Sequence, residues 1–332
     1  MNTIAANKTS KMLLATEEEI FAKLVDANHP FRALDAIINF TELVRPLAAL
    51  YSDLGTAGIA VEKGFKALLI QFWENYSDRD MEKCLRENIA VRWFCDFNLL
   101  EDTPDHSYFG KLRKRIGPDK LAEIFKTINE AMEEKGLFGN IFTFIDASSI
   151  ITKTALWEER DRAIKDGEET LNNAVVSHYA ADKDAKWGAK SKTNIWFGYK
   201  RHEAVDMRYG LIKDVMVTPA NVLDFKTVKN LCPKQGMVFM DKLFDCQETY
   251  FWLKANHCAA AVIRKNNNPA KNKDQDRWRS AIRMPFEGTF SKQNKRAKYR
   301  GQLKVAFQCF AEAIVYNLKK AIKLLPMEIA AA

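Results

Sequence analysis

The chain has 332 residues, of which 47% are apolar, and a formal charge of +8. It is therefore long enough to bury a core in two domains, or in one domain with a large appendage. The charge is concentrated: residues 264–323 hold sixteen Lys and Arg and four acidic residues, a net +12, which leaves −4 for the rest. This uneven distribution of charge favours a polyanionic partner, above all nucleic acid, over a small neutral substrate.

Several classes are excluded by what the sequence lacks. Apolar runs such as AEAIVYNL fall well short of the ~20 residues of a membrane span, so we expect no transmembrane helix and no membrane partner. Residues 1–23 run from a short apolar stretch into three glutamates, unlike a signal peptide. The six cysteines form no C-x-x-C pair, and no histidine flanks them at zinc-ligand spacing. We expect reduced thiols in a cytoplasmic, nucleoid-associated protein.

Up to about residue 138 the pattern is helical. Apolar residues recur at steps of three and four in FRALDAIINFTELVRPLAALY and in EKGFKALLIQFWENYSDRDMEKCL. Residues 103–136 continue the pattern, with Asp105 or Ser107 as a candidate N-cap and Gly136 as a stop. The sequence therefore predicts an all-helical domain over residues 1–138.

From residue 139 the pattern changes to short β-rich runs, namely NIFTFIDAS, NIWFGYKRHEAVD, YGLIKDVMVTPAN, GMVFMDK and CAAAVIRK. Helical patterns follow the third and fourth runs, and a closing helix is predicted from an apolar stripe. The stripe consists of Leu303, Phe307, Phe310, Ile314, Leu318, Ile322 and Leu325. This order predicts an α/β fold over residues 139–326, a mixed sheet flanked by helices. Residues near 155–192 are predicted as a surface insertion, and RKNNNPAKNKDQDR as an exposed loop.

Three acidic residues are candidates for chemistry. Asp146 closes the predicted strand FTFID and Asp241 closes MVFMD, and acids directly after buried strands gather at one edge of a sheet. Glu287 is the lone acid of the basic segment 283–304. Because Pro285 suits a first helical position, we expect Glu287 in the opening turn of a helix. Three such carboxylates repel one another unless cations neutralise them. Two Mg²⁺ ions about 4 Å apart would do so and could cleave a phosphodiester.

Each acid also has a purely structural interpretation. An Asp after a strand is more often a turn or cap residue than a ligand, and a Glu in a first turn needs no function beyond the helix dipole. The chain lacks both glycine-loop signatures as well as G-x-S-x-G and H-E-x-x-H. The common nucleotide-binding, serine hydrolase and zinc protease classes therefore have no support.

The blocks TFIDASSI, WFGYKRHEAVD, GLIKDVMVTPANVLD, VFMDKLFD and RMPFEGTFSKQNKRAKYRGQLK, in this order, resemble bacterial insertion-sequence transposases of the DDE type. The front part resembles the helical domain that precedes their core, so the resemblance extends over nearly the whole chain. It implies an RNase H-like catalytic core with Asp146, Asp241 and Glu287 as metal-binding triad. It also implies Mg²⁺ as cofactor, two ions with Mn²⁺ as a substitute, and a homodimer on double-stranded DNA.

The family's Y-x2-R-x3-E-x6-K signature is matched in part. Arg283 and Glu287 fit the arginine and glutamate, whereas Ser280 and Asn294 stand at the tyrosine and lysine positions. Leu243 replaces the glycine of the usual D-K-G-Y-D, and it would strain the turn if that glycine normally has a positive φ.

Positive side chains around the triad are expected to bind DNA phosphates. They are Lys200, His202, Arg283, Lys292, Lys295, Arg296, Lys298 and Arg300. The helical domain, with its basic segment GKLRKRIG, is the candidate for recognition of DNA ends or for dimerisation.

Three functions remain open. The first is an active transposase that binds the inverted repeats of its element, frees a 3′-OH and joins it to target DNA. The second is an inactive, transposase-derived DNA-binding protein. The third is a host RNase H-like nuclease.

Overall fold

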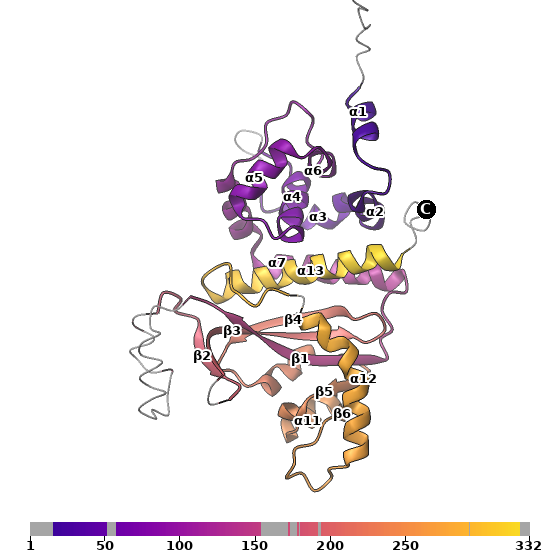
Figure 1. The fold of residues 1–332 in the computed structure, drawn as a ribbon, viewed down its shortest axis with the longest axis vertical. Coiled ribbons are helices and arrows are strands. Elements are labelled where there is room, and N and C mark those ends of the chain that lie inside the picture. The colour runs from indigo at the N-terminus through magenta and orange to yellow at the C-terminus, as the bar shows by residue number, and fades with distance from the viewer. Residues whose placement is uncertain are drawn as a thin grey trace, which may run out of the picture.

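A computed structural model describes residues 16–51, 58–153, 172, 178, 180–191, 194–291 and 293–325. Its first part is helical, as predicted, and lies above the sheet in Figure 1. The helices are α1 (Glu17–Leu24), α2 (Pro30–Ile37), α3 (Phe40–Ala48), α4 (Val61–Trp73), α5 (Asp78–Glu87), α6 (Ile89–Phe94) and α7 (His106–Glu134). No helix in the described ranges combines the length and the apolar character that crossing a membrane requires.

The long helix α7 begins and ends where its sequence predicts. The Asp105 carboxylate accepts hydrogen bonds from the backbone N–H groups of Ser107 and Tyr108, which makes Asp105 the N-cap. Gly136 has a φ of +72° just beyond the last helical residue, a conformation that glycine adopts without strain. The helix also contains a kink at Gly117, whose φ is +68° and which precedes Pro118.

The second part is built on a mixed sheet of β1 (Phe142–Ile151), β2 (Lys186–Ala189), β3 (Ile195–Asp206), β4 (Leu211–Pro219), β5 (Gly236–Met240) and β6 (Cys258–Val262). The strand order is β4-β3-β1-β5-β6, with β2 paired to the start of β3. Strand β3 is antiparallel to β1 and β4, whereas β1, β5 and β6 are parallel. This mixed sheet flanked by helices is consistent with the RNase H-like core and confirms the predicted fold class. Strand β2 falls within the predicted surface insertion, most of which lies outside the described residues.

Helices cover both faces of the sheet. On one face lie η1 (Asp224–Thr227), α10 (Val228–Leu231) and α11 (Gln247–Ala255), packed over an apolar cluster that includes Ile145, Val238 and Leu253. The short η2 (Lys242–Phe244) follows β5 directly. The closing helix α13 (Gln302–Leu324) packs with α7 against the other face, where β4 is its nearest strand. Helix α12 (Lys273–Ser291) packs against β1 and β6.

Two predicted positions within elements are wrong. Asp146 does not close its strand, because pairing with β3 carries β1 on to Ile151. Glu287 is not in an opening turn either. Helix α12 begins at Lys273, where the Asn272 side chain accepts hydrogen bonds from the first turn, and it continues through Pro285. Glu287 therefore lies one turn before the end of this helix.

The predicted stripe on α13 is too narrow. Leu303, at its start, is 68% exposed, whereas Val305, Cys309 and Ala313, which lie outside the stripe, are fully buried. Figure 1 shows the cause: α13 runs between the sheet and the N-terminal helices. A helix that is enclosed from both sides buries most of its circumference instead of one face.

One hydrophobic cluster extends from the helical part into the sheet. It joins side chains of α2, α4 and α7, such as Leu34, Ile70 and Ile128, to Ile314 of α13 and Phe144 of β1. The two predicted domains thus share a continuous core across residue 138.

Candidate active site

The parallel pairing of β1 with β5 brings Asp146 close to Asp241. Phe144 lies opposite Phe239 in this register, and each aspartate lies two residues further along its chain. Side chains two residues apart point to the same face of a strand. The Phe144 ring packs against Phe290 of α12, so Asp146 faces α12 as well. Sequence reasoning thus found two acids that the fold brings together.

The environment of this acid pair opposes its negative charge. Burial raises the pKa of Asp146 to about 7, and the charge of Asp241 also raises it, against a hydrogen bond from the Ala147 N–H and the charge of Arg283. Burial likewise raises the pKa of Asp241. Two neighbouring carboxylates that are half-buried, as these are, are destabilised as anions, and a bound cation would relieve this cost.

Leu243 leaves the second acid undistorted. The Asp241 carboxylate accepts a 2.7 Å hydrogen bond from the Leu243 N–H and caps η2. Among the described residues, the non-glycine positions with positive φ are Asn75, Asp96, Asn140 and His257. Leu243 does not have a positive φ, so leucine in place of the family's glycine causes no backbone strain there.

Glu287 is not close enough to the two aspartates to share a metal ion. Its carboxylate forms a 3.1 Å ion pair with Arg283, one turn earlier on α12, and its side chain is 50% exposed. Within the described part of the chain, no three His, Cys, Asp or Glu side chains are close enough to hold a metal. The structure thus brings together two of the three predicted ligands and leaves the third on the neighbouring helix.

Arg283 lies at the acid pair rather than on an outer surface. Its side chain is 16% exposed, and its guanidinium carbon is 5.6 Å from the centroid of the Phe144 ring. The Nε and Nη1 atoms are buried without a hydrogen-bond partner. Arg283 was predicted to contact DNA, but in this arrangement it is directed inward.

Two other predicted DNA contacts are enclosed by the protein. His202 is fully buried and hydrogen-bonded to Thr218 at 2.9 Å, and burial lowers its pKa to about 4. The predicted contact of His202 is wrong, because a neutral ring inside the sheet cannot reach a phosphate. Lys200 forms a 2.8 Å ion pair with Asp224, and both side chains are 13% exposed. The charge of Lys200 is therefore neutralised by Asp224 within the protein.

The remaining basic residues lie beside the end of β1. The Ile151 N–H donates to the Lys295 carbonyl, and the Ala297 N–H donates to the Ile151 carbonyl, so this segment extends the sheet. Five residues along β1 separate Asp146 from Ile151, a distance of about 17 Å. The basic segment and the acid pair therefore lie along one edge of β1, within reach of one bound duplex.

The exposure of these cations varies. Lys295, Arg296, Lys298 and Arg300 are all exposed as whole residues. Lys298 packs its amine 5.4 Å from the Phe72 ring centroid, and burial lowers its pKa. Lys292 lies outside the described residues.

Sequence reasoning missed a buried polar network behind the acid pair. Arg201 is fully buried and contacts Gln293 and Glu312, and Gln293 donates a 2.9 Å hydrogen bond to Glu203. Glu203 lies directly opposite Asp146 in the pairing of β1 with β3, and burial raises its pKa to about 7. The available signal was the charged pair Arg201 and Glu203 on a face of β3 whose other residues, such as Phe197 and Val205, are apolar or aromatic.

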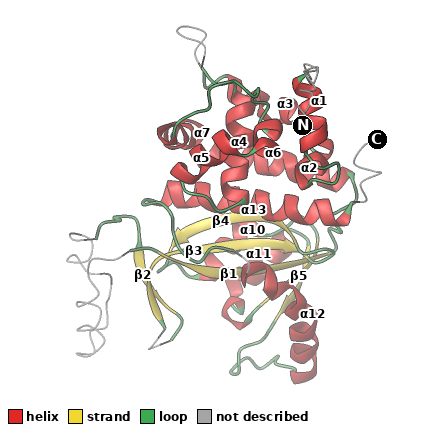
Figure 2. Ribbon diagram, turned by 45° about the horizontal axis from the view of Figure 1, so that its top comes forward, coloured by secondary structure: helices red, strands yellow, loops and turns green. Residues whose placement is uncertain are grey.

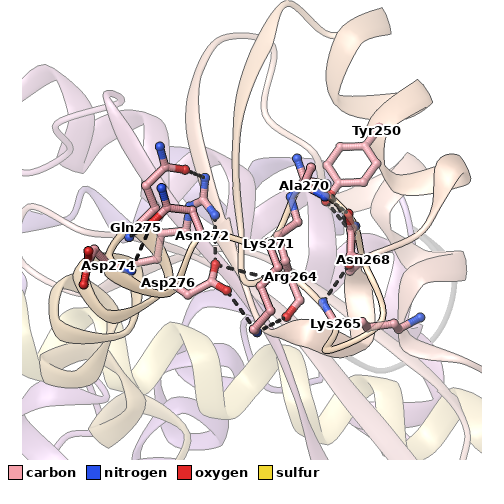
Figure 3. Close-up of polar contacts among 12 residues, drawn as sticks. Tyr250, Arg264, Lys265, Asn268, Ala270, Lys271, Asn272, Asp274, Gln275 and Asp276 are labelled. Carbon is pink, nitrogen blue, oxygen red and sulfur yellow. Dashed lines mark hydrogen bonds and ion pairs between the residues drawn. The ribbon is translucent and has the colours of Figure 1, made fainter.

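The start of α12 is fixed by a loop that was predicted to be merely exposed. The Asp276 carboxylate accepts hydrogen bonds from the Arg264 N–H and from the Lys271 amine, at 3.2 Å each (Figure 3). The Asp245 carboxylate accepts hydrogen bonds from the Lys265 N–H and the Asn268 amide. These anchors orient the helix that carries Arg283 and Glu287.

The chain is similar to known proteins over both of its parts. A family model described as a transposase domain matches residues 19–115, and one described as a transposase DDE domain matches residues 138–318. The transposase for insertion sequence element IS1106 of Neisseria meningitidis serogroup B is 29% identical over 227 residues, 64% of this chain and 77% of the relative. No solved structure matches the chain.

Proposed function

The chain belongs to the DDE transposases of insertion sequences, and on this premise we propose that Asp146, Asp241 and Glu287 bind its catalytic metal ions. It is a DNA transposase, an enzyme of a family that uses divalent metal ions to cleave DNA strands and to transfer them. The observation that supports the proposed site is the half-buried pair of Asp146 and Asp241, in which the charge of Asp241 disfavours that of Asp146, a repulsion that a metal ion would relieve.

The donor set fits a hard divalent cation. Carboxylate oxygens are the ligands that Mg²⁺ prefers in proteins, and all three proposed ligands are carboxylates. The proposed cofactor is Mg²⁺, two ions, with Mn²⁺ as a substitute. When bound, the ions act as Lewis acids that activate the attacking water or hydroxyl and stabilise the leaving oxygen.

The protein's own contribution is to hold the DNA. Lys295, Arg296 and Arg300 are exposed beside β1, where they would bind the phosphates that flank the bond to be cut. The proposed partners are the inverted repeats of the element and the target DNA. The helical part, residues 1–138, is the proposed domain for end recognition or dimerisation. Since strand transfer joins two ends, the proposed functional unit is a homodimer on DNA.

The test is the substitution Asp241→Asn. The variant should still bind DNA, since the phosphate contacts remain. Its cleavage rate should fall more than about a hundredfold, because loss of a residue that merely supports a metal ligand already lowers metal affinity or activity by about 10–100-fold. The measurement is cutting of a supercoiled plasmid that carries the element's ends, in Mg²⁺ and in EDTA, with a mobility-shift assay for binding. Asp274→Asn is the matched control, since that carboxylate is 93% exposed and lies on the same helix as Glu287. Full cleavage by Asp241→Asn would remove this residue from the mechanism.

The two alternative functions predict other outcomes of the same assay. An inactive derivative would bind the ends but leave the plasmid uncut in Mg²⁺, and a host nuclease would cut without the element's ends. Family membership favours the transposase. Of the departures from the family's motifs, Leu243 is unstrained, and the Asn294 amide donates a hydrogen bond to Asn75 of the helical part.

A further inference from the structure

The charge of Arg283 acts on both members of the acid pair. Burial dominates the pKa of Asp146 and of Asp241, but the positive charge of Arg283 lowers both. Its guanidinium carbon lies 5.6 Å from the centroid of the Phe144 ring, on the face of β1 that also carries Asp146. Arg283 is thus a cation already present where the proposed function requires metal.

Arg283 is nevertheless weakly held. The only ion pair that it forms within 4 Å in the described structure is to Glu287, and its Nε and Nη1 atoms are buried without a partner. A buried guanidinium normally has its N–H donors satisfied. Arg201 differs in that both of its terminal nitrogens have partners, Gln293 and Glu312, and its Nε alone has none. Displacement of the Arg283 side chain from this position should therefore require little free energy.

Glu287 depends on the same arginine. The two residues are one turn apart on α12 and form a 3.1 Å ion pair, in which the Glu287 side chain is half exposed. A divalent cation at Asp146 and Asp241 would repel the guanidinium over a short distance in a partly buried site. Expulsion of Arg283 would break this ion pair and free the carboxylate.

We propose that Arg283 is the internal counter-ion of Asp146 and Asp241 in the metal-free protein, and that metal entry displaces it and releases Glu287 to the metal. Arg283 is thus a positioning residue that couples occupancy of the two aspartates to arrival of the third ligand. The inference rests on the proposed function, since it takes these three acids as the ligands.

The experiment is a titration of the full chain with Mn²⁺ in the absence of DNA, with free Mn²⁺ measured by electron paramagnetic resonance. Arg283→Gln should bind Mn²⁺ about tenfold more tightly than the unmodified chain, because the ion no longer competes with a fixed positive charge. Arg283→Lys keeps a positive charge and should restore near-normal affinity. Arg277→Gln is the matched control, since it removes one charge from an 84% exposed side chain of the same helix, and it should leave the affinity unchanged.

Folding is checked by thermal unfolding of each variant. Should Arg283→Gln fail to fold, Arg283→Met carries the test, because its unbranched side chain still packs on Phe144. An Mn²⁺ affinity that is unchanged or lower in the folded neutral variant would overturn the inference.

A further variant separates this inference from the proposed function. If Asp146→Asn binds Mn²⁺ like the unmodified chain, the proposed metal site is wrong, and the role of Arg283 is wrong with it. If Asp146→Asn loses binding while Arg283→Gln binds normally, the metal site stands and only the displacement of Arg283 is contradicted.

Discussion

At the scale of single residues, the molecule distinguishes two kinds of buried arginine. Arg283 lies beside the acid pair with its Nε and Nη1 atoms unpartnered, whereas Arg201 belongs to a network with Glu312, Gln293 and Glu203. The network joins β3 to α13 and to the chain that follows α12. It thereby supports the strand that lies opposite Asp146.

Removal of one member of this network should lower the free energy of unfolding substantially. Glu312→Ala leaves the Arg201 charge buried without its carboxylate, which typically destabilises a protein by about 3–5 kcal/mol. Glu248→Ala breaks the more exposed ion pair with Lys226 and should cost no more than about 1 kcal/mol. Urea unfolding of both variants measures the difference. If the two variants lost similar amounts of unfolding free energy, the buried ion pair of Arg201 and Glu312 would not support the fold.

The sequence pointed to Asp146 and Asp241 because an acid at or near the end of an apolar run is conspicuous. It could not reveal the ion pair of Glu287 with Arg283, because two residues four apart on a helix pair only in particular rotamers. Nor could it reveal that His202 is enclosed. The alternation of a strand gives the face of a side chain, but what covers that face is set by distant segments.

At the scale of elements, the site depends on where α12 begins. Burial disfavours the charge of Asp245, but hydrogen bonds from the Lys265 N–H, Tyr250, Asn268 and Arg264 outweigh it and lower the pKa to about 2. This carboxylate ties the loop after β6 to the short helix after β5. Protonation of Asp245 should therefore loosen the support of α12.

This gives a prediction for the dependence of stability on pH. Since the folded-state pKa lies below the ordinary 3.8, Asp245 contributes stability above about pH 4 that is lost as the pH falls towards 2. A shift of about two pKa units corresponds to about 2–3 kcal/mol. Asp245→Asn should therefore be less stable than the unmodified chain at pH 6, with the difference vanishing near pH 2.

Urea unfolding at a series of pH values measures this difference. Asp274→Asn, at a 93% exposed position, should show no such pH dependence. A difference between Asp245→Asn and the unmodified chain that stays constant from pH 6 to pH 2 would show that the Asp245 charge does not anchor the loop.

Element boundaries were harder to predict than element types. The five predicted strands and the main helices are present, because their apolar periods are clear. The start of α12 was missed, because residues 272–280 are polar apart from Trp278 and the helix is fixed by the Asn272 cap rather than by an apolar stripe. The end of β1 was misplaced, because it depends on pairing with β3.

At the scale of the whole molecule, α13 links the helical part to the sheet (Figure 2). Its Asn317 side chain donates to the Ile212 carbonyl of β4 and to Asn129 of α7, and apolar residues around the helix join one core. The sequence indicated two regions from their different periodicity. It could not indicate that a helix of the second region completes the core of the first, because this contact joins segments far apart in the chain.

The shared core also fixes the position of the acid pair within the molecule. Helix α12 and the basic segment after it connect β6 to α13, so Glu287 and Lys295 are held between two elements that are both anchored. In this account the catalytic centre is assembled from the sheet and completed from α12 when metal enters.

The most direct test of this account is anomalous diffraction at the manganese edge from crystals of the full chain grown with Mn²⁺. We expect an anomalous peak between the carboxylates of Asp146 and Asp241, with Glu287 turned towards it and the Arg283 guanidinium displaced. Manganese bound elsewhere, with these two aspartates bare, would contradict it.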